Sequence, residues 1–206
     1  MAKRDRHAVM TLYSDPECLL CHRVRFVAQE KNIPLLIENS IDKPWPEEVA
    51  AANPYGNSPT LVNRDLILFN SDIIIDYFND RFLQPMLLPS DPEGRARTKL
   101  LLHRIDQEWY PLWQTLSESS KQKSNQARKT LIEDLTVLSP VFEQHRFFMN
   151  DEFSILDCYL APLLWRLFSL SIKLPSKAWA VEQYAERIFA RPAFQASLSN
   201  IELTMR

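Results

Sequence analysis

Glycine is almost absent from this chain: Gly56 and Gly94 are the only two glycines in 206 residues, against roughly 7% in average proteins. Glycine-rich phosphate loops, G-x-G-x-x-G dinucleotide turns and G-x-S-x-G nucleophile elbows each need clustered glycines. The tight turns of a hairpin-rich all-β protein also favour glycine, because they require positive φ angles. The shortage therefore excludes those three motifs and argues against an all-β fold.

The charge of the chain gives no sign of a nucleic-acid-binding surface. The formal net charge is −2, whereas nucleic-acid-binding domains are usually basic. We therefore expect no direct sequence-specific DNA binding. The apolar run after the charged start covers only residues 8–10, short of the roughly 7–15 residues of a secretory signal, and no apolar stretch reaches the about 20 residues that span a bilayer. We expect a cytoplasmic protein without a membrane-spanning segment.

Apolar patterning predicts a thioredoxin-like α/β domain at residues 8–82. Helical spacing indicates helices at residues 21–31, 47–52 and 72–82, with Ser71 as the cap of the last one. Short apolar runs indicate strands at residues 9–13, 35–38, 60–62 and 66–69. Three polar residues separate the last two runs, which predicts an antiparallel hairpin. The expected element order is βαβαββα.

The rest of the chain is expected to be a linker and an all-helical domain. Prolines 85, 89 and 92 indicate a linker at residues 83–94, and residues 95–206 are predicted to be helical. Three stripes of apolar residues follow helical spacing. They consist of Leu101, Ile105, Trp109, Leu112 and Leu116; of Ala127, Leu131, Leu135, Leu138 and Phe142; and of Val181, Tyr184, Ala185, Ile188 and Phe189. Residues 155–168 are apolar nearly all round, which predicts a central buried helix.

The segment Cys18-Leu-Leu-Cys21-His22 lies between a predicted strand and a predicted helix. A thiol at a helix N-terminus has a lowered pKa because it meets the positive end of the helix dipole, and Arg23 and Arg25 can add to this effect. The segment thus fits a thioredoxin-like redox pair, and the plain alternative is two small residues at a helix start. It also matches a c-type haem motif and half of a zinc site. We expect no export signal and find no second ligand pair, so neither haem nor metal is expected.

A turn with the sequence Asn53-Pro-Tyr-Gly-Asn-Ser58-Pro59 precedes the third predicted strand. Proline cannot donate a hydrogen bond to a sheet, so it needs an edge or a bend there. A cis Ser58–Pro59 bond would explain its position, and a plain turn is the simpler alternative. In a thioredoxin-like sheet this turn faces the first helix, where its free backbone groups can pair with an extended peptide such as glutathione.

Ser154 and Asp157 open the predicted buried helix as a shortened capping box. The Ser154 side chain can accept a hydrogen bond from the Asp157 backbone N–H, and the Asp157 carboxylate can accept one from the Ser154 N–H. Such a cap stabilises a protein by about 1 kcal/mol. The expected role of both residues is structural.

Taken together, these features resemble the glutathione-transferase superfamily, in which a thioredoxin-like domain, a linker and a helical domain with an internal Ser-x-x-Asp follow one another. Within it, three segments resemble the bacterial stringent starvation protein A family: residues 21–25 (CHRVR), 103–110 (HRIDQEWY) and 151–167 (DEFSILDCYLAPLLWRL). The resemblance covers the whole chain and implies a glutathione-transferase-like architecture. It also implies a homodimer, or a heterodimer with a paralogue, that binds RNA polymerase holoenzyme, regulates transcription in starvation and stress, and has no transferase activity.

Two sites depart from what the resemblance implies. A Pro-His-Pro surface motif implicated in polymerase contact corresponds here to Leu83, Gln84 and Pro85, of which only the last matches. Superfamily enzymes hold the γ-glutamyl end of glutathione with Glu-Ser, where this chain has Asn70 and Ser71. Asparagine accepts hydrogen bonds but brings no charge to the ligand's ammonium group. The resemblance therefore implies an altered partner-binding loop and a vestigial glutathione site.

Two functions remain as hypotheses. The first is a regulator that binds RNA polymerase and needs no cofactor. The alternative is a cysteine-type glutathione transferase or glutathione-dependent thiol reductase, with Cys18 as the nucleophile. Its glutathione-binding residues would be Ser58 and Pro59 for the backbone, and Asn70 and Ser71 for the γ-glutamyl group. A third hypothesis, that oxidation of the two N-terminal cysteines modulates partner binding, is less favoured, because a bond within one helical turn constrains only that turn.

Overall fold

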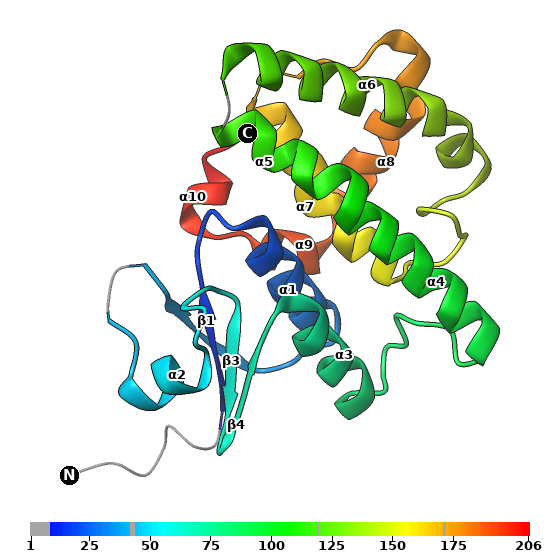
Figure 1. Cartoon of the computed structure of the whole chain (residues 1–206). Helices are drawn as coiled ribbons and strands as arrows, with labels where there is room; N and C mark the ends of the chain where they lie inside the picture. Colours follow the sequence, from blue (N-terminus) through cyan, green and yellow to red (C-terminus); the bar gives the residue numbers. More distant parts are fainter. Residues whose placement is uncertain (1–8, 42–43, 119, 171) are drawn as a thin grey trace. The chain divides into compact units, whose positions relative to one another are not determined.

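The computed structural model describes residues 9–41, 44–118, 120–170 and 172–206, and Figure 1 shows their helices and strands. The chain divides into two compact units. One consists of Met1–Pro85 together with Ala193–Thr204, and the other of Met86–Pro192 together with Met205–Arg206. The segment Ala193–Thr204 thus groups with the α/β unit, whereas the sequence places it in the helical domain.

The first unit is built on a four-stranded sheet in the order β2-β1-β3-β4, formed by β1 (Met10–Ser14), β2 (Leu35–Asn39), β3 (Thr60–Asn63) and β4 (Leu66–Phe69). Strand β1 is parallel to β2 and antiparallel to β3, and β3 and β4 form the predicted hairpin. Figure 1 shows α1 (Leu19–Glu30) and α3 (Ser71–Arg81) on one face of the sheet and α2 (Glu47–Ala52) on the other. The predicted order βαβαββα and the thioredoxin-like fold class are confirmed.

The start of α3 differs from the prediction, because Asn70 and not Ser71 is the N-cap. The Asn70 side-chain oxygen accepts a hydrogen bond from the Asp72 backbone N–H at 2.8 Å, and Asn70 has a φ of 76°. Asparagine enters this left-handed region more readily than most residues and is also a favoured cap. Ser71 is instead the first residue of the helix and is buried.

Helix α1 is buried along most of its length although it carries cationic side chains. Arg23 and Arg25 are both buried, and each guanidinium group meets a carboxylate. The Nη2 atom of Arg23 lies 2.7 Å from Oδ1 of Asp72, and Nη2 of Arg25 lies 2.6 Å from Oε2 of Glu202. Because a buried charge is tolerated only when it is paired, these contacts are a condition for the position of α1 in the core.

The C-terminal helices α9 (Pro192–Ser197) and α10 (Asn200–Leu203) bring the partners of α1. Glu202 is fully buried, and its carboxylate also accepts a hydrogen bond from the Ser199 backbone N–H at 2.8 Å in a capping box. The two ring nitrogens of His22 lie 3.4 Å from Oε1 of Glu202 and 3.0 Å from Oγ of Ser197. The segment Ala193–Thr204 is therefore held against α1 by polar contacts.

The second unit is helical and consists of α4 (Pro92–Arg104), the π-helix η1 (Ile105–Trp109), α5 (Tyr110–Glu118), α6 (Lys121–Gln144), α7 (Ile155–Ser169), the 3-10 helix η2 (Ser176–Ala178) and α8 (Trp179–Phe189). Residues 155–167 of α7 are all buried, which confirms the predicted central helix. Most members of the three predicted stripes are buried too, while Leu101, Leu112 and Leu138 are half-buried.

Helix α4 begins at Pro92, inside the predicted linker. None of the helices in the described part of the chain combines the length and the apolar character needed to cross a bilayer.

Substitution of Glu202 by glutamine removes the negative charge that faces the buried Arg25 guanidinium. We expect the free energy of unfolding to fall by about 3 kcal/mol, because breaking a buried ion pair leaves an uncompensated charge. Urea-induced unfolding followed by circular dichroism measures this change. The matched control is Glu186→Gln, since Glu186 pairs with Arg206 at the surface, where an ion pair contributes less than about 1 kcal/mol. Equal losses in the two variants would contradict the role given to Glu202.

Candidate functional site

Cys18 is the N-cap of α1. Its backbone is extended, with φ −69° and ψ 124°, and its Sγ accepts a hydrogen bond from the Cys21 backbone N–H at 3.4 Å. The sequence predicts that this helix begins at Cys21, but the helix starts earlier, so that Cys21 lies in its first turn. Cys18 is half-buried, Cys21 is buried, and both are free thiols. As the N-cap, Cys18 holds its sulfur close to the N–H groups of the first turn, which have no partner within the helix itself.

The two thiols have opposite pKa shifts. The hydrogen bond from the Cys21 thiol, helped by the backbone N–H groups of Cys21 and Leu20, lowers the pKa of Cys18 to about 7, against the opposing effects of burial and of Asp15. Burial, followed by the hydrogen bond and the charge of Cys18, raises the pKa of Cys21 well above its ordinary value. The expected help from Arg23 and Arg25 is not among the causes of the Cys18 shift. Both guanidinium groups pair with carboxylates.

The turn at Ser58 and Pro59 faces the first turn of α1. The Ser58–Pro59 peptide bond is cis, as in the first of the two alternatives from the sequence. The Ser58 side chain forms a hydrogen bond with the Cys21 thiol, which lowers the pKa of that thiol. The Asn53 side chain holds the turn with hydrogen bonds of 2.8 Å to the Asn57 carbonyl and to the Thr60 hydroxyl. Ser58 and the cysteine pair therefore form one cluster.

Ser71 is tied to α1 through Arg23. The Nη2 atom of Arg23 donates to the Ser71 hydroxyl at 2.5 Å and to the Asp72 carboxylate at 2.7 Å. Asn70 is exposed, and its side-chain oxygen is used in the cap. Asn70 is neutral, but Asp72 carries a negative charge next to Ser71. Its side chain is 50% exposed. Sequence reasoning missed Asp72, although an acidic residue in the first turn of a predicted helix was the available signal.

The loop with Leu83, Gln84 and Pro85 is exposed and anchored. Leu83 is 70% exposed, and the Gln84–Pro85 peptide bond is cis. The buried Lys31 ammonium donates to the carbonyl oxygens of Phe82, just before the loop, at 2.7 Å and of Pro85, its last residue, at 2.8 Å. No sequence signal pointed to Lys31, because its partners lie more than fifty residues away.

Asp157 is a hydrogen-bonded carboxylate inside the helical unit. It accepts from the Ser154 N–H at 2.8 Å, as expected, and also from the Phe148 N–H at 2.9 Å and the Tyr184 hydroxyl at 2.7 Å. The Ser154 hydroxyl accepts from the Leu156 N–H, at 3.3 Å, and not from that of Asp157. Burial raises the pKa of Asp157 to about 6, against the effect of its hydrogen bonds. The Tyr184 contact joins α7 to α8, so the role of Asp157 is structural.

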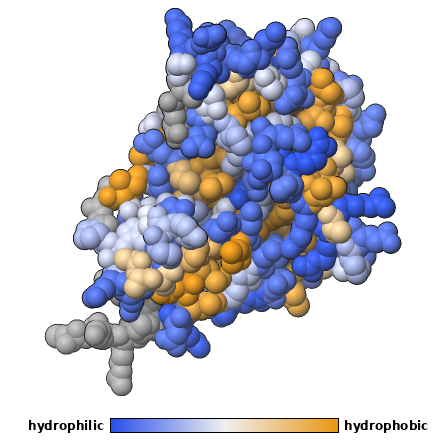
Figure 2. Space-filling model, viewed as in Figure 1, coloured by the Kyte–Doolittle hydropathy of each residue, from blue (hydrophilic) through white to orange (hydrophobic). Residues whose placement is uncertain are grey.

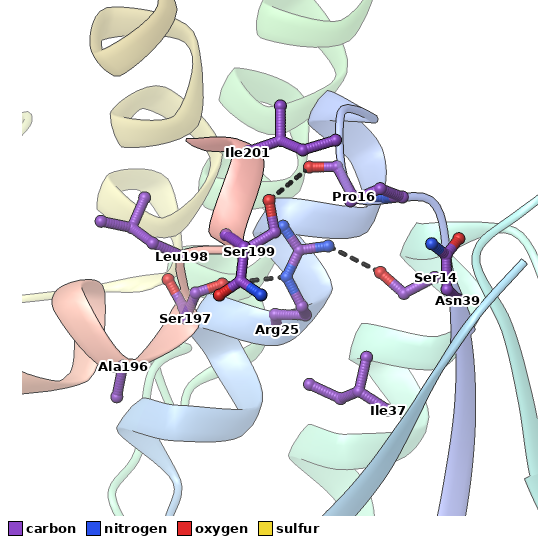
Figure 3. A pocket seen from close by; sticks show the side chains of 11 residues that line it. Ser14, Pro16, Arg25, Ile37, Asn39, Ala196, Ser197, Leu198, Ser199 and Ile201 are labelled. Atoms are coloured by element: carbon purple, nitrogen blue, oxygen red, sulfur yellow. Dashed lines mark hydrogen bonds between the residues drawn. The ribbon is translucent and has the colours of Figure 1, made fainter. Parts of the chain in front are cut away.

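A cavity of about 380 Å³ lies in the first unit between the end of β1, β2, Arg25 of α1 and the C-terminal helices. Figure 3 shows the Arg25 side chain among its lining residues and the Ser199 hydroxyl directed at the Pro16 carbonyl. Arg25 donates hydrogen bonds to Ser14, Ser197 and Glu202, so its charge is already compensated. None of the predicted glutathione-binding residues lines this cavity, and the described residues hold no group of three or more His, Cys, Asp or Glu placed to bind a metal ion.

Comparison with known proteins gives matches over nearly the whole chain. Residues 12–85 match the N-terminal domain of glutathione S-transferases, and residues 87–192 match the C-terminal domain. The Stringent starvation protein A homolog of Haemophilus influenzae is 41% identical over 94% of this chain and 92% of its own length. The Stringent starvation protein A homolog of Coxiella burnetii is 40% identical over 98% of this chain and 97% of its own length.

Among solved structures, glutathione transferase Omega 3C from Trametes versicolor has a TM-score of 0.82 and covers 93% of this chain and 84% of its own. Its sequence is 22% identical, so this likeness concerns the fold. The glutathione-transferase-like architecture expected from the sequence is thereby confirmed.

Alkylation of Cys18 tests the electrostatics of the cluster. Because the thiolate is the nucleophile, the rate of reaction with iodoacetamide should have its midpoint near pH 7 and fall about tenfold per pH unit below it. In Cys21→Ala the donating thiol is lost, and we expect the midpoint to move up toward about 8.5. Peptide mass spectrometry measures both rates, with the buried Cys158 as the internal reference. An unchanged midpoint in Cys21→Ala would contradict the assigned cause.

Proposed function

Since this chain belongs to the stringent starvation protein A family of the glutathione-transferase superfamily, we propose that it regulates transcription in starvation and stress by binding RNA polymerase holoenzyme. The observation that carries the proposal is the similarity to relatives of that name over nearly the full length of both chains. The proposed regulator acts in the cytoplasm, as a homodimer or with a paralogue. It acts by protein–protein contact, without transferase activity and without direct sequence-specific DNA binding.

The loop at Leu83, Gln84 and Pro85 supports a protein-binding role. Leu83 offers an exposed apolar side chain, and Lys31 fixes the loop at both ends. A loop that is already ordered loses little conformational entropy when a partner binds, so more of the contact energy is available for affinity. On the face that Figure 2 shows, hydrophobic residues gather in small groups within a mainly hydrophilic surface.

The charge balance also favours a protein partner. A protein that binds DNA through its phosphates needs several cationic side chains directed at them. Here the formal net charge is −2, and the arginines of α1 are occupied by carboxylates within the fold. The proposed route to the promoter is therefore contact with the polymerase.

Leu83→Asp tests the loop. With purified RNA polymerase holoenzyme, we expect biolayer interferometry to show specific binding of the wild type and at least about tenfold weaker binding of the variant, which corresponds to about 1.4 kcal/mol. The matched control is Val137→Asp on α6, where the side chain is 77% exposed, and its affinity should stay within about twofold. No binding by the wild type would overturn the proposed function, and equal binding by Leu83→Asp would remove the loop from the interface.

A second candidate function, a glutathione-dependent thiol transferase, is favoured by the cluster around Cys18. Its lowered pKa makes Cys18 a nucleophile at neutral pH, and the Ser58–Pro59 turn lies against the same helix start. Ser71 and Asp72 would hold the γ-glutamyl group, with hydrogen bonding from the first and negative charge from the second. The Arg23 contacts with both residues would have to persist or rearrange around the ligand.

An assay of mixed-disulfide reduction by glutathione tests this candidate. Cys18→Ser should lower the rate to that of the uncatalysed reaction, because the attacking thiolate is removed. Ser71→Ala should raise the KM for glutathione while a thiolate remains at Cys18. Cys158→Ala is the control and should leave both constants unchanged. Wild-type protein that does not exceed the uncatalysed rate would exclude the activity.

A further inference from the structure

We propose that Cys18 and Cys21 form a reversible dithiol–disulfide couple, in which Cys18 attacks a substrate disulfide and Cys21 resolves the mixed disulfide. The substrates are disulfides of small molecules or exposed peptides. The couple shares the Cys18 nucleophile with the second candidate function, but it needs neither the polymerase nor a glutathione site.

The geometry allows the bond. The Cys18 Sγ lies 3.4 Å from the Cys21 backbone nitrogen, and the Cys21 thiol forms a hydrogen bond with it. Helix dimensions separate two Cα atoms three residues apart by about 5 Å. Disulfides join Cα atoms at about 4.4–6.8 Å, so this separation lies within the range of a disulfide.

Burial assigns the two roles. Cys18 is half-buried, so a substrate disulfide can reach it, whereas Cys21 is 0% exposed and meets only groups inside the fold. At neutral pH about half of Cys18 is thiolate, while Cys21 keeps its proton and donates it to the Cys18 sulfur. The more accessible thiolate, Cys18, is therefore the attacking group, and the buried thiol, Cys21, is the resolving group.

The reaction balances in two steps. In the first, the Cys18 thiolate attacks one sulfur of the substrate R–S–S–R′, a Cys18–S–S–R bond forms, and R′S⁻ leaves. In the second, Cys21 loses its proton and attacks the Cys18 sulfur, so that a Cys18–Cys21 disulfide forms and RS⁻ leaves. One departing thiolate takes up the proton of Cys21, and the other takes up from the solvent the proton that Cys18 released when it became a thiolate. The substrate is reduced by two electrons and the protein is oxidised by two.

The environment of Cys21 changes in a way that promotes the second step. In the reduced protein, the hydrogen bond and the negative charge of Cys18 both raise the pKa of Cys21, after the larger effect of burial. Once Cys18 is in a mixed disulfide its sulfur is neutral, so both of these contributions are lost. The Ser58 hydrogen bond, which favours the Cys21 thiolate, does not involve Cys18. Ser58 is thus a positioning residue for the resolving thiol.

The fold tolerates the cycle because the new bond is local. It closes within one turn of α1, while Arg23 and Arg25 hold the same helix to Asp72 and Glu202. Oxidation is therefore expected to leave the protein folded and to change only the surroundings of Cys18 and the neighbouring Ser58 turn.

Intact-protein mass spectrometry after acid quenching tests the couple, with 2-hydroxyethyl disulfide as the probe because it lacks any glutathione group. We expect the reduced wild type to lose two hydrogen atoms without a lasting adduct, and dithiothreitol to restore them. Cys21→Ser should stop with one mercaptoethanol group on Cys18, and Cys18→Ser should react at least about tenfold more slowly. Cys158→Ala is the matched control and should behave as the wild type does.

Two further results decide the outcome. Ser58→Ala should prolong the lifetime of the adduct on Cys18 several-fold, with circular dichroism showing that the variant is folded; an unchanged lifetime would remove Ser58 from the mechanism. A wild type that keeps a stable adduct, as Cys21→Ser does, would overturn the couple. So would a wild type that stays fully reduced while Cys18 still reacts with iodoacetamide.

Discussion

The buried ion pair between Arg25 and Glu202 is the interaction on which the arrangement of the first unit depends. Helix α1 lies in the interior with two arginines, and a cation in such a place must be paired and hydrogen-bonded. Glu202 comes from the opposite end of the chain, 177 residues away, and brings α10 against α1. Arg23 does the same for the start of α3 through Asp72.

The same helix positions both candidate sites. At its N-terminus, the first turn supplies the N–H groups and the thiol that make Cys18 acidic. At its C-terminus, Lys31 holds the loop that contains Leu83 through two carbonyl oxygens. A thiol site and a protein-binding loop thus depend on one rigid element, although each is tested by variants that leave the other intact.

Much of the fold could be predicted from the sequence, because local periodicity reports local structure. The hairpin of β3 and β4, the buried α7 and the stripe through Leu131 and Leu135 all follow from spacing over a few residues. Capping was less predictable: Asn70 rather than Ser71 caps α3, since a positive φ at Asn70 brings its side chain into reach of the first turn. Lys31 and Asp72 were missed because an isolated charge gives no sign of its distant partner.

By itself the sequence determined the order of elements, the cysteine pair at a helix start and the membership of the family. These depend on short-range spacing and on motifs that can be read directly. Only the tertiary structure decided that residues 193–204 join the α/β unit, that Ser58 meets Cys21, and that the two thiols differ in pKa. The physical reason is that burial and pairing depend on groups far apart along the chain, whose meeting is set by the packed fold.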